Sequence, residues 1–185
     1  MNNIKIVFAM IWLFIFNSVS ASVKEDSIEI EAFSKRYFPD SSRDMKDMYL
    51  NGASIGYFLT DDVRFGFSYG VYNDGESTNE TGKKSIHGHL ASIDATYQFK
   101  LDQNNNLKPY ISAGFGHQNI TNMNSSNYRR QTLKMMMVGT GLKYYFLDSY
   151  FLKIGADAQY GLENRSNSHQ LEWMGNLAIG MNFGD

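Results

Sequence analysis

The chain has 185 residues, of which 43% are hydrophobic and 15% aromatic, with a formal net charge of −2 and no cysteine. Without cysteine it can form no disulfide and can carry no catalytic thiolate. The charge is too small to indicate nucleic acid as a partner, and we expect none.

The N-terminal residues have the pattern of an export signal. Lys5 supplies the positive charge, the apolar run Ile6–Phe16 follows, and small residues up to Ala21 suit cleavage by a signal peptidase. A membrane-spanning helix needs about 20 apolar residues, so an uncleaved anchor is the less favoured interpretation. We therefore expect a signal peptide at 1–21 and one domain at 22–185.

Apolar and polar residues alternate along the whole mature chain, a pattern that predicts about eight β-strands. The clearest example is VRFGFSYGVY, in which Val63, Phe65 and Phe67 share one face with later apolar residues. The predicted strands are Ser27–Phe38, Met48–Leu59, Val63–Tyr72, Ile86–Phe99, Leu107–Gln118, Gln131–Phe146, Phe151–Leu162 and Gln170–Phe183. Each is long enough to cross a bilayer at a tilt of about 45°.

The connections between these strands alternate in length. The shorter ones are Thr60–Asp62, Lys100–Asn106 and Leu147–Ser149, and the longer polar ones are Pro39–Asp47, Asn73–Ser85, Asn119–Arg130 and Glu163–His169. Outer-membrane barrels have short periplasmic turns and longer outer loops. The sequence therefore predicts an all-β fold, an eight-stranded antiparallel up-and-down transmembrane β-barrel in the bacterial outer membrane. The alternative is a soluble periplasmic barrel with its apolar residues inside.

One face of most predicted strands is apolar and the other is small or charged. A small barrel has little room inside, which suits glycine and serine beside a few long charged side chains, so we expect the apolar face to meet lipid. The predicted lumen charge network is Glu29, Glu31, Lys35, Arg64, Asp94, Lys143, Lys153, Asp157 and Glu172. Buried charges cost several kcal/mol each unless they are paired, so we favour a network that fills and stiffens the barrel. The alternative is that Arg64, paired with a glutamate, gates small ions.

Aromatic residues near both ends of the strands predict two belts at the membrane interfaces. They are Tyr49, Tyr57, Tyr97, Phe99, Tyr144, Phe146, Trp173 and Phe183. The first strand fits this division less well, because Phe33 falls on the face of the glutamates and Arg36 on the apolar face. This misfit predicts either a β-bulge or a strand end raised above the membrane.

Several stretches resemble a known family. IEIEAFSKRYFPDSSRDMKDMYLNGASIGYFLTDD, LKPYISAGFGHQNITNMNS, VGTGLKYYF and AQYGLENRSNSHQLEWMGNLAIGMNFG are similar to the N-terminal barrel of OprF/OmpA-like outer-membrane porins. The resemblance covers essentially the whole mature chain and implies a structural role in the envelope with weak porin activity. Family members carry a separate C-terminal domain that binds peptidoglycan. The sequence stops at Asp185, just after the last predicted strand. We therefore expect no such domain and no wall anchoring; the alternative is that the sequence is a fragment of a longer protein that has this domain.

The expected partners are outer-membrane lipid, lipopolysaccharide and, during insertion, the barrel-assembly machinery, and we expect a monomer. His87 and His89 share a strand face without an evident third ligand, so no metal site is predicted. A lipid A-modifying enzyme would need a pair such as His117 with Ser112, which we place on opposite faces. We therefore expect no enzyme and no cofactor, and the remaining alternative is an adhesin acting through its outer loops.

Overall fold

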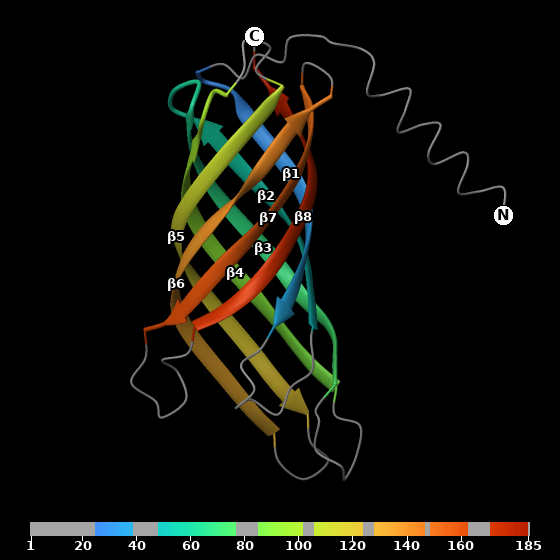
Figure 1. The fold of residues 1–185 in the computed structure, drawn as a ribbon. Coiled ribbons are helices and arrows are strands. Elements are labelled where there is room, and N and C mark those ends of the chain that lie inside the picture. The colour runs from blue at the N-terminus through green and yellow to red at the C-terminus, as the bar shows by residue number, and fades with distance from the viewer. Residues whose placement is uncertain are drawn as a thin grey trace, which may run out of the picture.

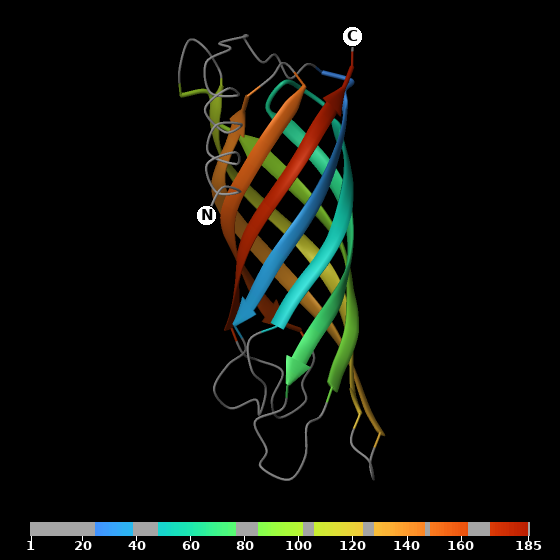
Figure 2. The same cartoon turned by 90° about the vertical axis from the view of Figure 1, so that its right-hand side faces the viewer.

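In the computed structural model, eight antiparallel strands form a closed barrel (Figure 1 and Figure 2). The strands are β1 (Ile28–Phe38), β2 (Met48–Phe58), β3 (Val63–Glu76), β4 (Ser85–Gln98), β5 (Leu107–Met123), β6 (Tyr128–Tyr145), β7 (Tyr150–Gly161) and β8 (Leu171–Phe183). The structure describes residues 25–38, 48–76, 85–101, 106–123, 128–146, 149–162 and 171–184, so the predicted signal peptide lies outside it. The predicted eight-stranded up-and-down barrel is confirmed.

Each strand pairs with its neighbours in sequence, and β1 pairs with β8 to close the sheet. A closed barrel satisfies the backbone N–H and C=O groups of its strands within the protein, as a hydrocarbon environment requires. Across the described ranges we find no helix with the length and apolar character needed to cross a membrane.

The short turn between β2 and β3 shows how local chemistry ends a strand. The side-chain oxygen of Thr60 accepts hydrogen bonds from the backbone N–H groups of Asp62 at 3.3 Å and of Val63 at 3.1 Å. The backbone N–H of Leu59 donates to the carbonyl oxygen of Val63 at 2.9 Å. A threonine side chain that captures two backbone donors in this way replaces ladder hydrogen bonds and reverses the chain.

The strands are staggered around the barrel. Following directly paired residues once around the sheet from Ile28 returns to β1 at Phe38, ten positions along the same strand. The path is Ile28, Tyr57, Phe65, Ala95, Ala113, Val138, Ala158, Trp173 and Phe38. A stagger of this size tilts eight strands by about 40° and leaves an interior just wide enough for side chains.

Three strands extend further towards the long connections than predicted. β3 continues to Glu76, β5 continues to Met123 and β6 begins at Tyr128, whereas the other strand ends lie within one residue of the prediction. The β5–β6 ladder runs as far as the pair Met123 and Tyr128, and both views show these strands reaching beyond the rest of the barrel (Figure 1 and Figure 2). Their outer ends lose the apolar alternation because they lie beyond the apolar wall, so the pattern could not mark them.

The misfit in the first predicted strand is not a bulge. The register of β1 is continuous with both β2 and β8, and among the described pairs only β3 and β4 show a register shift, between Tyr72 and Gly75. The bulge explanation is therefore wrong. Phe33 points into the lumen, whereas Arg36 is exposed on the outer wall with its guanidinium 5.2 Å from the ring centre of Phe38.

The apolar side chains face outward. Ile154 is 61% exposed, and Ile93, Leu177 and Val138 are similarly uncovered, while charged residues such as Arg64 are buried inside. A water-soluble barrel would have the reverse arrangement, because burial of apolar surface is the main favourable term in folding in water. The wall is therefore built to contact an apolar medium.

Candidate functional site

Near the short-turn end, a group of charged side chains closes the lumen. The Oε2 atom of Glu29 accepts a hydrogen bond from the Nζ atom of Lys143 at 2.6 Å, and its Oε1 atom lies 2.9 Å from the Nε atom of Arg64. The side chains of these three residues are at most 2% exposed. We call Glu29, Arg64 and Lys143 the ionic seal.

The position of Arg64 depends on neighbouring glycines. Its guanidinium also contacts Asp94 at 3.2 Å and the Ser54 hydroxyl at 3.0 Å, so its charge is compensated on two sides. A Cβ atom at Gly56 or Gly66 would overlap the guanidinium, so both positions must lack a side chain for Arg64 to lie flat against the wall. Because a buried charge is tolerated only with compensating partners, this close packing is what allows Arg64 to occupy the lumen.

Beyond the ionic seal, towards the long loops, lies a polar cavity of about 40 Å³. The Nζ atom of Lys153 lies 3.2 Å from both carboxylate oxygens of Glu31, and the Nζ atom of Lys35 donates to the Oδ2 atom of Asp157 at 2.6 Å. The side chains of Lys35 and Lys153 are 13% and 11% exposed, and because both face inward this exposed area lies inside the barrel.

The cavity has room for a few water molecules, since each needs about 10–15 Å³. Asn176 lines this cavity, and its Oδ1 atom is buried without a hydrogen-bond partner in the described part of the protein. We call this cavity the polar chamber. It is also lined by Ser68, Ser92, Asp94, Thr96 and Ser112.

An apolar cluster caps the polar chamber on the side of the long loops. Its members are Phe33, Tyr37, Met48, Leu50, Tyr72, Leu90, Ile120, Leu133, Met135, Met174 and Ala178, and we call it the apolar seal. The rings of Tyr37 and Tyr72 meet edge to face at 5.9 Å, and the Nε2 atom of Gln118 donates to the Tyr72 hydroxyl at 2.6 Å. The sequence analysis did not predict this cluster. The one indication of it was Phe33, an apolar residue on the same strand face as the glutamates.

The structure brings together most of the predicted lumen charges. Glu29, Glu31, Lys35, Arg64, Asp94, Lys143, Lys153 and Asp157 form ion pairs within the ionic seal or around the polar chamber. Glu172 is buried nearer the long loops, where it accepts a hydrogen bond from Gln159 at 2.9 Å. Sequence reasoning missed one further buried cation, Lys108, whose Nζ atom lies 5.4 Å from the ring centre of Tyr145. Alternation with Tyr110 could have placed it on the inner face.

Tyr110 fills part of the lumen beside the polar chamber. Its ring lies 5.0 Å from the Nζ atom of Lys153, and its hydroxyl rests against Gly141 and Gly155 on the two following strands. A Cβ atom at Gly155 would overlap this hydroxyl. The glycines predicted on the inner face therefore leave space for the large side chain of Tyr110. With this side chain in place, the lumen is filled across its width.

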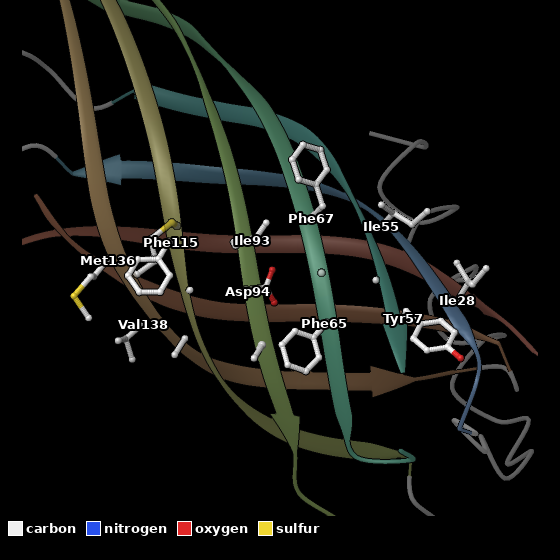
Figure 3. A pocket seen from close by; sticks show the side chains of 16 residues that line it. Ile28, Ile55, Tyr57, Phe65, Phe67, Ile93, Asp94, Phe115, Met136 and Val138 are labelled. Carbon is white, nitrogen blue, oxygen red and sulfur yellow. The ribbon is translucent and has the colours of Figure 1, made fainter. Parts of the chain in front are cut away.

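The predicted belt residues all lie on the outer wall. Tyr57, Tyr97, Phe99 and Phe183 are exposed at the short-turn end with Tyr144 and Phe146 partly exposed, and Tyr49 and Trp173 are exposed nearer the long loops. Between these levels lies a shallow apolar hollow of about 760 Å³. Figure 3 shows Phe65, Phe67 and Val138 projecting from the strands around it. Its shape and apolar lining suit the acyl chains of lipid.

The described histidines do not form the arrangement that an acyl-transfer enzyme would need. His117 is exposed on the outer wall and His89 stacks there on Tyr69 with ring centres 6.0 Å apart, whereas Ser92 and Ser112 line the polar chamber. His169 lies outside the described residues. Within those residues, no group of three His, Asp or Glu side chains is placed to hold a metal ion.

Comparisons with known proteins agree with this architecture. Residues 6–185 match the family model for the OprF membrane domain. Outer membrane porin F of Pseudomonas aeruginosa is 56% identical over 160 residues, which cover 86% of this chain and 45% of that protein. Outer membrane porin F of Pseudomonas fluorescens is 34% identical over 161 residues, which cover 86% and 48%. The chain thus spans about half the length of these curated relatives.

Two solved structures give the same picture. The N-terminal β-barrel domain of Pseudomonas aeruginosa OprF superimposes with a TM-score of 0.67 at 46% identity, covering 86% of this chain and 98% of that one. Neisserial surface protein A superimposes with a TM-score of 0.61 over 84% of this chain and 94% of that one. At 18% identity, the second match shows a shared fold only.

Proposed function

Because the chain belongs to the OprF membrane domain family, whose members are bacterial outer-membrane β-barrels, we propose that it is mainly a structural barrel of that membrane with a narrow passage for small ions. The protein is located in the bacterial outer membrane, and its relatives there are named porins. The proposal includes a monomeric barrel surrounded by lipid and lipopolysaccharide, inserted by the barrel-assembly machinery.

The observation that carries this proposal is the filled lumen. The ionic seal and the apolar seal each cross the interior, and the polar chamber between them holds only about 40 Å³. Eight-stranded barrels are generally filled by side chains in this way, whereas barrels with twice as many strands leave an aqueous channel. A lumen of this kind supports stiffness of the wall and excludes sugars, nucleotides and peptides.

Two measurements test the proposal. In outer-membrane fractions, the folded barrel should resist detergent and change its gel mobility only after boiling. In planar bilayers, wild-type protein should give small and infrequent conductance steps, while liposomes that contain it should not swell in sugar solutions. Swelling at the rate of a general porin would refute the narrow passage, and absence of the heat-dependent mobility shift would refute the folded barrel.

A second candidate function is attachment through the outer end of the barrel. The observation that favours it is the β5–β6 ladder, which extends to Met123 and Tyr128 beyond the other strands (Figure 2). Replacing 122–129 with the two-residue turn Asn-Gly shortens this hairpin and keeps Ile120 of the apolar seal, so it should leave the heat-dependent mobility shift intact and abolish binding of whole cells to host surfaces. Unchanged cell binding by the shortened variant would dismiss the adhesin interpretation.

A further inference from the structure

We propose that the lumen is closed by two seals in series, one ionic and one apolar, so that ions cross only when both open. This inference rests on the proposed function, since it assigns the residues that limit the narrow passage. The ionic seal lies towards the periplasmic turns and the apolar seal towards the outer loops. The polar chamber lies between them, so the ionic seal separates it from the periplasmic side and the apolar seal separates it from the outer side.

The dryness of the two seals supports this assignment. Tyr37, Met48 and Leu50 of the apolar seal have no exposed surface, so no water-sized space touches them from either side. In contrast, Lys35 and Lys153 beside the polar chamber retain exposed surface inside the barrel. The lumen therefore changes from dry to wet and back to dry along its length.

The apolar seal spans most of the circumference of the barrel. It draws side chains from β1 to β6 and from β8, and the remaining inward position of β7 at this level, Gln159, is occupied by its hydrogen bond to Glu172. A constriction lined by apolar groups excludes ions because it offers nothing to replace their hydration shell. Rearrangement of the ion pairs around Arg64 would leave this barrier in place.

The ionic seal resists ions for a different reason. Glu29 is bound by Lys143 and Arg64 together, and each of these contacts must be replaced before an ion can pass. Opening the apolar seal alone therefore leaves the other end closed. The expected behaviour is that either opening exposes the polar chamber, while only the two openings together allow conduction.

The absence of native cysteine allows this behaviour to be measured at one position. Ser112→Cys places a thiol in the polar chamber, and its reaction with a small methanethiosulfonate reagent, applied to both faces of lipid vesicles, reports access to the chamber. Glu29→Ala with Lys143→Ala removes both contacts of Glu29 and opens the ionic seal, while Arg64 keeps Asp94. Leu50→Ser with Met135→Ser opens the apolar seal from β2 and β6, which face each other across the barrel.

We expect the thiol to react about tenfold faster when either seal is opened, whereas conductance should rise about tenfold only in the variant with both seals opened. The matched control is Leu142→Ser with Met136→Ser, the same changes made on the outer wall, which should alter neither readout. The heat-dependent mobility shift identifies folded variants, and Leu50→Ala with Met135→Ala replaces the serine pair if that pair does not fold.

Three results would overturn the inference. The first is a thiol that reacts as fast in the otherwise unaltered barrel as in the opened variants. The second is a single-seal variant that conducts as well as the combined one, and the third is a folded combined variant that conducts no better than wild type. Swelling of wild-type vesicles in sugar would instead refute the proposed function, so the two failures are distinguishable.

Discussion

Replacing Glu29 by glutamine should strongly destabilise the barrel although the change removes no volume. Glu29 is the carboxylate shared by two buried cations, at 2.6 Å from Lys143 and 2.9 Å from Arg64. In the variant, Arg64 keeps Asp94 at 3.2 Å. Lys143 exchanges a carboxylate for a neutral amide oxygen, and its other described contacts are aromatic rings, the nearest being Phe151 at 4.2 Å. Breaking a buried ion pair on one side costs about 3–5 kcal/mol because a charge is left uncompensated.

The free energy of unfolding can be measured by urea titration of the barrel folded in lipid vesicles. We expect Glu29→Gln to lose about 3–5 kcal/mol, and Glu29→Gln with Lys143→Met to recover about 2 kcal/mol of that loss, because the second change removes the unpaired charge. The control is Lys100→Gln, which breaks an exposed pair with Asp62 at 3.3 Å and should change stability by less than about 1 kcal/mol.

The reasoning fails if Glu29→Gln costs no more than the exposed control. It also fails if the losses of the two lumen substitutions simply add, since additivity would mean that the carboxylate and the ammonium group do not interact. A large coupling between the two positions is the result that the short distance requires.

Other predictions address the wall and the packing. Ile154→Arg should cost about 2–4 kcal/mol of unfolding free energy in vesicles, against about 0–1 kcal/mol for Tyr150→Arg at the strand end, and equal costs would refute the membrane depth assigned to β7. Trp173, the only tryptophan in 22–185, should be quenched by brominated lipid, and quenching by aqueous acrylamide alone would reverse the face assignment. Gly155→Val should lower stability by about 1–3 kcal/mol through its clash with Tyr110, and Tyr110→Phe should restore part of the loss in the same titration.

The number of strands and the two faces of the wall could be predicted from the sequence. Apolar residues recur at every second position wherever one face of a strand contacts lipid. Val63, Phe65 and Phe67 follow that rule throughout. The alternation rule could not detect the outer ends of β3, β5 and β6. Strand segments above the membrane do not contact lipid, so hydrogen bonds to neighbouring strands stabilise them without requiring one apolar face.

For the lumen, the sequence predicted most of the charged residues that point inward but not which of them pair with one another. Alternation placed Glu29 and Lys143 inside, but their pairing depends on a stagger of ten positions around the sheet, which no single strand encodes. The apolar seal was missed for a related reason. Tyr37, Met48 and Leu50 are apolar residues that point into the lumen. A rule that places every apolar residue on the lipid face and every polar residue on the lumen face cannot predict them.

The ion pairs of the lumen join segments that are made at very different times. Lys143 and Glu29 are separated by 114 residues, and the pairs of Lys153 with Glu31 and of Lys35 with Asp157 by 122. Contacts between such distant parts of a chain form slowly, because the intervening polypeptide must first be brought together. In the first strand, Glu29 can meet Arg64 once the third strand is present and Lys143 once the sixth is present, whereas Glu31 and Lys35 obtain their partners only after the seventh has arrived. The contacts of Glu31 and Lys35 therefore belong to the closing stage of biogenesis and distinguish a finished barrel from a partly assembled one.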